Sequence, residues 1–225
     1  MGEKGLIIVI EGTDASGKKT QIAHLRERLE KEHHTTGLLD FPRYENESSI
    51  FVRRFLAGEY GDATLLPPKL SSYFYALDRF DASKGIHQEL AEGKILVSNR
   101  YTTSNIGHQG AKFSTNEERK EFFTWLDHFE FDELGIPRPD LVIFLDVPPA
   151  ISLRLLEERA AKDNLKKDGL DEPEHLKAAH ASYSLAAEIL PGWCKVSCVS
   201  DNGQDIASIE DIHERIWEKV KEKLS

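Results

Sequence analysis

Short apolar runs alternate with stretches of helical spacing along the whole chain. Residues 6–10 form the first run, in which every side chain is leucine, isoleucine or valine and no charge intervenes. Such a run is typical of a strand that is buried on both faces of a parallel sheet. Four later runs of similar character are also predicted to be strands, at residues 38–41, 95–97, 141–147 and 195–199.

Apolar side chains recur at intervals of three and four between these runs, which predicts amphipathic helices. The alternation of strands and helices predicts an α/β fold, a doubly wound sandwich with right-handed crossovers. The first helix is expected to begin at about Lys18, and Gly37 to end that stretch. Its buried stripe is expected to be Ile22, Leu25 and Leu29. A second helix is predicted over residues 48–57, with Ile50, Phe55 and Leu56 buried. A longer helix opens at Pro67-Pro68, and its expected buried stripe is Leu70, Phe74 and Leu77.

Two further helices have recognisable first turns. Thr115 and Glu118 have the spacing of a capping box, in which each side chain accepts from the backbone N–H of the other residue. Ser208 and Asp211 have related spacing before the last apolar stripe. The sequence therefore predicts helices that begin just after Thr115 and just after Ser208.

The composition fits one domain of ordinary core size. The chain has 225 residues, of which 40% are hydrophobic, and we predict a single domain over residues 1–225. The formal net charge of −10 argues against a nucleic-acid binder that neutralises a phosphate backbone. Any phosphate that the protein binds is therefore expected to be small and held in a local basic site.

Cysteine usage and the short apolar runs predict a cytoplasmic protein. Cys194 and Cys198 are the only cysteines, and their surroundings favour two thiols on or beside a core strand over a disulfide or metal pair. Glu3 and Lys4 stand near the start and no apolar run exceeds five residues. Neither a signal peptide nor a membrane-spanning helix is expected.

A glycine-framed turn follows the first apolar run directly. Gly12 and Gly17 bracket it and Lys18 comes next, which gives the pattern G-x-x-x-x-G-K. Glycine lets backbone N–H groups curl around a phosphate, and the lysine and the start of the helix add positive charge. The flanking strand and helix favour this interpretation over an ordinary surface turn. The predicted ATP-binding residues are Gly12, Thr13, Asp14, Ala15, Ser16, Gly17, Lys18, Lys19 and Thr20.

The position after Lys18 departs from this pattern. A Ser or Thr there ligates Mg²⁺, but Lys19 occupies the place and Thr20 stands one residue later, about 100° further around the helix. Thr20 is therefore the candidate metal ligand. Two alternatives stay open: other groups and water hold the metal, or metal use is impaired.

Two arginines stand where predicted strands end. Arg43 follows Phe41-Pro42 and Arg100 follows the strand at 95–97. Because the carboxyl ends of parallel strands line the binding crevice, both are candidates for a second anion. Arg43 alone is equally consistent with a solvated loop charge. Residues 102–109 are rich in hydrogen-bonding side chains that can read a base edge, although any loop can contain them.

Other chemistry-bearing residues have two open interpretations each. Tyr75 and Arg79 lie four apart on one helix face, which suits a stacked base with hydrogen bonds or a surface cation–π pair. Asp146, near the end of the fourth predicted strand, can orient groups in the crevice or cap a turn. Basic residues cluster further along the chain, and they indicate either a lid over residues 157–172 or a run of charges that is merely solvated. These residues are Arg154, Arg159, Lys162, Lys166 and Lys167.

Five motifs in order resemble the thymidylate kinase family of P-loop nucleoside monophosphate kinases. They read GTDASGKKTQ, DFPRY, YALDRF, NRYTTSN and LVIFLDVPP. The resemblance implies a P-loop NTPase α/β/α sandwich with a five-stranded parallel sheet, a lid and usually a homodimer. It also implies transfer of phosphate from ATP, with Mg²⁺, to dTMP.

The resemblance implies a role for each matching residue. Asp14 matches the acidic residue that binds the 3′-hydroxyl of dTMP, and Tyr75 matches an aromatic residue that stacks on thymine. The glycine loop has no arginine, so a lid arginine is implied, with Arg154 and Arg159 as candidates. The implied catalytic residues are Lys18, Arg43, Arg100 and Arg159; the substrate-binding residues are Asp14, Arg43, Tyr75, Arg79, Arg100, Ser104, Asn105 and Gln109.

Two departures from the family pattern bear on the metal. Lys19 replaces the hydroxyl ligand, and Asn99 replaces an aspartate that commonly steadies a Mg²⁺-bound water. We therefore expect turnover with an unusual metal dependence. A catalytically weakened nucleotide-binding regulator is one alternative, and a deoxynucleoside kinase or another nucleoside monophosphate kinase is a second. A GTPase would need an Asn-Lys-x-Asp guanine reader, which the sequence lacks.

Overall fold

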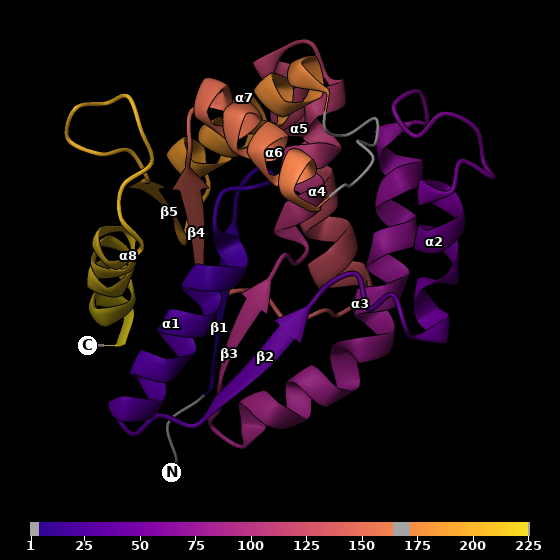
Figure 1. Ribbon diagram of the computed structural model, residues 1–225. Helices are drawn as coiled ribbons and strands as arrows, with labels where there is room; N and C mark the ends of the chain where they lie inside the picture. Colours follow the sequence, from indigo (N-terminus) through magenta and orange to yellow (C-terminus); the bar gives the residue numbers. More distant parts are fainter. Residues whose placement is uncertain (1–4, 164–171, 225) are drawn as a thin grey trace.

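A computed structural model describes residues 5–163 and 172–224 of the chain. At its centre lies a five-stranded sheet with the order β2-β3-β1-β4-β5, in which every neighbouring pair is parallel (Figure 1). This sheet, layered between helices, confirms the predicted α/β sandwich. The strands are β1 (Leu6–Glu11), β2 (Thr36–Asp40), β3 (Ile95–Asn99), β4 (Leu141–Asp146) and β5 (Trp193–Ser197).

Helices cover the sheet and gather around the carboxyl ends of its strands. In Figure 1, α1 and α8 lie on one side of the sheet, α2 and α3 on the other, and α4 to α7 at the carboxyl end. Short 3₁₀ turns (Glu47–Ser49, Gly110–Lys112) and a π-helical turn (His128–Glu133) join some of them. The helices are α1 (Lys18–Lys31), α2 (Ile50–Leu56), α3 (Pro68–Ala91), α4 (Thr103–His108), α5 (Asn116–Asp127), α6 (Pro149–Asp163), α7 (Pro173–Ile189) and α8 (Ile209–Leu224).

The central strand β1 is buried on both faces, as its apolar sequence predicts. Ile8 and Ile10 pack into a cluster with residues of α1 and α8, whereas Ile7 and Val9 pack into a cluster that includes Ile86 of α3. Successive side chains of a strand alternate between the faces, so a strand covered on both sides has no polar face. This burial fixes the strand that carries the glycine loop.

The predicted buried faces of α2 and α3 are partly wrong. Phe55 is buried in α2, but Ile50 and Leu56 are exposed, and in α3 both Leu70 and Leu77 are exposed. The inward face of α3 instead carries polar residues, among them the fully buried Asp78. Apolar periodicity identifies the buried face only when that face meets an apolar core, whereas α3 turns polar side chains toward the carboxyl edge of the sheet.

Other local predictions hold or need small corrections. The capping box is present, with Glu118 N–H donating to Thr115 Oγ1 at 3.2 Å, and Asp211 N–H donates to Ser208 Oγ at 3.0 Å. Gly37 does not end the first helix stretch but lies inside β2, where a Cβ would come within 2.5 Å of a Leu96 methyl group. Close packing between neighbouring strands therefore accounts for this glycine.

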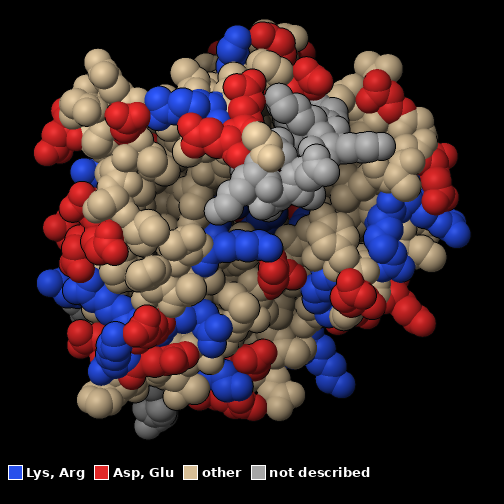
Figure 2. Space-filling view, in the orientation of Figure 1, with Lys and Arg blue, Asp and Glu red and all other residues tan. Residues whose placement is uncertain are grey.

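The surface of the protein carries charged side chains of both signs. Figure 2 shows basic and acidic side chains interspersed over the face it presents, without one extended basic field. On the face shown, such mixing differs from the continuous basic track that binds a phosphate backbone. In the described ranges, no helix is both long and apolar enough to cross a membrane.

Candidate active site

The turn from β1 to α1 has the backbone of a phosphate-binding loop. Gly12 and Gly17 have φ angles of 155° and 84°, which glycine adopts without steric cost. A Cβ at Gly12 would also lie 2.6 Å from Ser16 Oγ. Since α1 begins at Lys18, its first backbone N–H groups point toward the loop and favour an anion there.

The Lys18 side chain lies inside this loop. Its ammonium donates to the carbonyl oxygens of Gly12 and Thr13, each at 2.8 Å, and lies 4.0 Å from the Asp14 carboxylate. Only 8% of Lys18 is exposed. An ammonium held in a largely desolvated turn is placed to meet phosphate oxygens that enter the same turn.

A buried carboxylate that the sequence analysis missed supports the loop. Glu11, the last residue of β1, is fully buried and accepts from the hydroxyls of Thr103, Ser104 and Tyr183 at 2.7, 2.8 and 2.9 Å. Burial and Glu11 raise the pKa of Tyr183, so its hydroxyl stays protonated and donates. Glu11 thereby connects the start of the loop to α4 and α7 by hydrogen bonds. The Ser104 hydroxyl, which was predicted to read a base, donates to Glu11 in this structure.

Asp14 of the glycine loop forms an ion pair with Arg100, which follows β3. Arg100 Nη2 donates to Asp14 Oδ1 at 2.5 Å. Burial acts to raise the pKa of Asp14, but Arg100 and Lys18 outweigh it and hold that pKa below its ordinary value. Arg100 also has a φ of 63°, a conformation rare outside glycine and enriched at functional sites. The structure thus brings together two residues that the sequence analysis places in the acceptor site.

Arg43, at the exit from β2, is held by carboxylates of α3. Its Nε and its backbone N–H donate to Asp78 at 3.0 and 2.8 Å, and its Nη2 donates to Asp81 at 2.7 Å. Asp78 is fully buried, whereas the Arg43 side chain keeps 24% exposure. A buried carboxylate therefore orients the guanidinium while leaving part of it accessible to an anion.

Arg79 of α3 is buried and does not lie at the surface, where a cation–π pair with Tyr75 would have placed it. It is 2% exposed, and its Nε and Nη2 form a two-pronged ion pair with Glu130 at 2.7 and 2.6 Å. Glu130, on the π-helical turn, also accepts from Asn105 Nδ2 at 3.1 Å. The structure therefore pairs Arg79 with Glu130, a residue that the sequence analysis missed. Tyr75 lies half-buried, with its ring edge-on to Phe55 and the ring centroids 6.1 Å apart.

Gln109 adds a buried amide to the polar groups of this region. It is 4% exposed, and within the described part of the chain its Oε1 has no hydrogen-bond partner. A buried oxygen of this kind costs free energy unless a water or a ligand bonds to it. The role of Gln109 in reading a polar ligand stays a prediction.

The predicted lid falls mostly outside the described part of the chain. Residues 164–171, including Lys166 and Lys167, are not described, and neither are the side chains of Lys162 and Arg159 on α6. Arg154 donates to Asp205 at 2.7 Å, in the segment after β5. The lid and the role of Arg159 remain predictions.

The residues at the carboxyl ends of β2 and β3 fit a hydrated magnesium ion. Asn99 is buried, and its Oδ1 has no hydrogen-bond partner in the described ranges. Its Nδ2 donates to Asp40 Oδ1 at 2.7 Å, so a carboxylate stands beside the position where the family pattern has aspartate. Oxygen atoms of this type are what Mg²⁺ and its waters prefer. Thr20 is exposed, as is Lys19.

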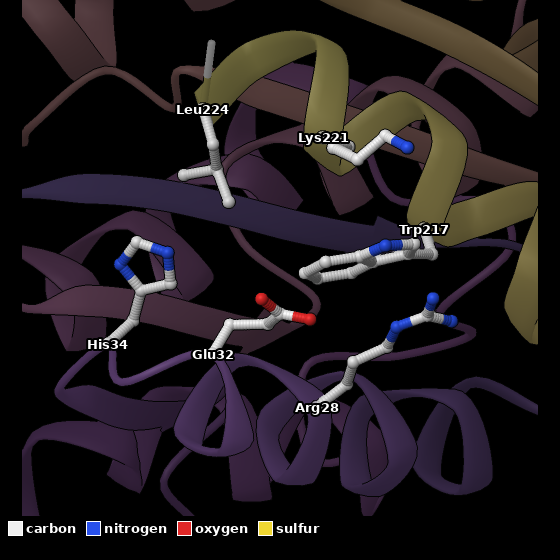
Figure 3. Close-up of a pocket in the computed structure, with 6 residues that line it drawn as sticks. All are labelled: Arg28, Glu32, His34, Trp217, Lys221 and Leu224. Atoms are coloured by element: carbon white, nitrogen blue, oxygen red, sulfur yellow. The ribbon is translucent and has the colours of Figure 1, made fainter.

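A cavity of about 450 Å³ lies far along α1 from the glycine loop (Figure 3). It opens between the carboxyl end of α1 and α8, and the Arg28 guanidinium lies 4.4 Å from the centre of the Trp217 ring. It contains none of the predicted site residues. Its lining residues are Arg28, Glu32, His34, Trp217, Lys221 and Leu224.

A glycine loop on the central strand and arginines at the ends of neighbouring parallel strands define a P-loop nucleotide-binding protein. A family model described as thymidylate kinase matches residues 10–216. The chain belongs to the thymidylate kinase family.

Individual relatives agree with this family. The chain is 30% identical to a thymidylate kinase of Mycobacterium tuberculosis, covering 91% of this chain and 97% of that protein. It is 31% identical to a probable thymidylate kinase of Pyrococcus horikoshii, with 98% of each covered. A solved thymidylate kinase from Candida albicans has a similar fold, with a TM-score of 0.71 at 21% identity over 98% of this chain and 93% of that one.

Proposed function

We propose that this protein transfers the γ-phosphate of ATP to dTMP and produces dTDP. The observation that carries the proposal is the placement of Lys18, Arg43 and Arg100 at the carboxyl ends of adjacent strands of one sheet. A donor phosphate in the loop and an acceptor phosphate beside the arginines would then lie along the same edge.

The donor site is the glycine loop with the start of α1. Backbone N–H groups over residues 12–20 and the Lys18 ammonium would bind the β- and γ-phosphates of ATP. Thr20, Asn99 and Asp40 are the oxygen-bearing residues that would hold Mg²⁺ or its waters. When bound, Mg²⁺ would offset the negative charge of the phosphates.

The acceptor site lies between the loop, β2, β3 and α3. Asp14 would accept from the 3′-hydroxyl of dTMP, and Arg43 and Arg100 would bind its phosphate. The base would stack on Tyr75, with its polar edge facing Arg79, Ser104, Asn105 and Gln109. Support comes from the burial of Arg79, Asn105 and Gln109, because polar groups desolvated in advance discriminate strongly between ligands.

Catalysis would rest on position and charge. The dTMP phosphate is already an anion, so it needs little activation as a nucleophile, and no side chain has to remove a proton from it. Lys18, Arg43 and Arg100 would hold both phosphates in line and stabilise the charge of the transition state. Arg159 is the proposed additional arginine, supplied by a lid over residues 157–172 of a single domain.

A nucleotide panel with and without Mg²⁺ tests this function. We expect dTDP from ATP and dTMP, little product from thymidine, and loss of turnover when the metal is removed. Nucleotide binding without product would favour the alternative, a catalytically weakened regulator that Lys19 and Asn99 suggested. The Asp40 carboxylate beside Asn99 argues against that alternative, since it restores negative charge near the metal position.

We also propose that the protein forms a homodimer through α3. The outward face of α3 carries large apolar side chains that are 39–49% exposed, at the repeating spacing of one helix face: Leu70, Tyr73, Leu77 and Phe80. A second copy of the chain would bury them.

We also propose a cytoplasmic location, which the free thiols Cys194 and Cys198 support.

Leu77→Lys is expected to convert the dimer into a monomer, because a charge would enter the centre of the buried face. Sedimentation velocity measures the change. The matched control is Leu65→Lys, which lies outside α3 and is 80% exposed, and it should remain a dimer. A wild-type protein that sediments as a monomer at micromolar concentration contradicts the proposed interface.

A further inference from the structure

A row of hydrogen-bonding side chains runs behind Arg100 and includes two histidines. Arg100 Nη1 lies 2.5 Å from His108 Nε2, and His108 Nδ1 lies 3.4 Å from His175 Nε2. The two imidazole rings stack, with centroids 5.7 Å apart and planes inclined by 14°. His108 ends α4 and His175 lies in the first turn of α7, so the row connects both helices to the end of β3.

The chemistry of the groups gives this row a direction. A guanidinium has donors only, so His108 Nε2 must accept from Arg100 and the ring proton lies on Nδ1. Nδ1–H then donates toward His175 Nε2, which is unprotonated in turn. Each ring is therefore held in one tautomer by its neighbour.

The surroundings keep His108 neutral. Burial and Arg100 lower the pKa of His108, while Asp14 acts in the opposite direction. The ring of Tyr183 on α7 lies edge-on to His108, with centroids 6.0 Å apart. A protonated His108 would place a second positive charge beside Arg100, and the two charges would repel each other.

We propose that His108 is a positioning residue that holds Arg100 in the acceptor site, with His175 supporting it. The positive charge of Arg100 is already partly offset by the Asp14 carboxylate. A second carboxylate in the place of His108 would offset it further and weaken the attraction of Arg100 for an incoming phosphate. A neutral imidazole instead orients the guanidinium without reducing its charge. Arg100 also has a left-handed backbone, a conformation that persists only where surrounding contacts stabilise it, and the contact with His108 is one of these.

The consequence for dTMP binding rests on the proposed function, whereas the hydrogen-bond row itself does not. Nitrogen-15 NMR of the histidine rings tests the row directly. At pH 7 we expect His108 in the neutral tautomer with the proton on Nδ1, and Arg100→Lys should weaken that preference. The half-buried His34, which lines the cavity away from the glycine loop, provides a reference ring in the same spectrum. A proton on His108 Nε2, or a charged ring, would overturn the inference.

Kinetics test the positioning role. His108→Phe keeps a flat ring but has no acceptor, so we expect KM for dTMP to rise about tenfold, the size of one hydrogen bond to a charged group. KM for ATP should change less than twofold. His108→Gln supplies an amide oxygen as acceptor and should recover most of the loss, and the control His34→Phe should leave both constants unchanged.

The outcomes separate this inference from the proposed function. An unchanged KM for dTMP in His108→Phe, or equal losses in the Phe and Gln variants, would overturn the positioning role. Failure of the wild-type protein to bind dTMP would overturn the proposed function, while the tautomer measured by NMR would still decide whether His108 holds Arg100.

Discussion

Lys18→Ala is expected to lower kcat for dTMP phosphorylation by about a hundredfold or more, as the loss of a preorganised charged group at a reacting phosphate generally does. The ammonium is largely buried and already lies among the loop carbonyl oxygens, so little reorganisation accompanies the reaction. Steady-state kinetics with ATP and dTMP measure the loss, and circular dichroism checks that the variant folds.

Lys31→Ala is the matched control for this substitution. Lys31 lies at the other end of the same helix, is exposed and pairs with Glu27 at 2.7 Å. It should keep wild-type kcat. A Lys18→Ala protein that is folded and turns over at a near-normal rate would exclude the proposed role of the glycine loop in transfer.

Glu130→Ala is expected to lower the free energy of unfolding by about 3–5 kcal/mol, because it leaves the buried Arg79 guanidinium without its counter-charge. Both members of the pair are almost completely buried, and Asn105 would lose an acceptor as well. Urea unfolding followed by fluorescence measures the change in stability.

Two comparison variants make this result specific. Glu133→Ala, on the same π-helical turn but exposed, should change the unfolding free energy by less than about 0.5 kcal/mol. The double variant Arg79→Met with Glu130→Leu removes both charges and should recover much of the stability lost in Glu130→Ala. Equal stability of wild type and Glu130→Ala would show that the buried pair does not hold the π-helical turn to α3.

Local signals in the sequence were sufficient for the sheet and the glycine loop. The apolar run of β1 is buried on both faces, and Gly12, Gly17 and Lys18 follow it in a pattern whose spacing carries the chemistry. Arg43 and Arg100 were identified from strand exits alone, since parallel strands present their carboxyl ends at one edge. Each of these inferences depends only on residues that are close together in the sequence.

The partners of those residues could not be predicted in the same way. Glu11 accepts from Tyr183, and Arg79 pairs with Glu130, across long separations in the chain. No periodic pattern in the sequence marks such pairs, because each residue on its own resembles a charged residue of the surface. The buried face of α3 was misassigned for a related reason: it carries Asp78, whereas burial was sought among apolar residues.

A crystal structure with dTMP and a non-hydrolysable ATP analogue bound together tests the central claim most directly. The account predicts the γ-phosphate group of the analogue within hydrogen-bond distance of Lys18, and the dTMP phosphate on Arg43 and Arg100 at the same edge of the sheet. A complex in which Lys18 contacts no phosphate, or in which dTMP binds away from both arginines, would contradict it.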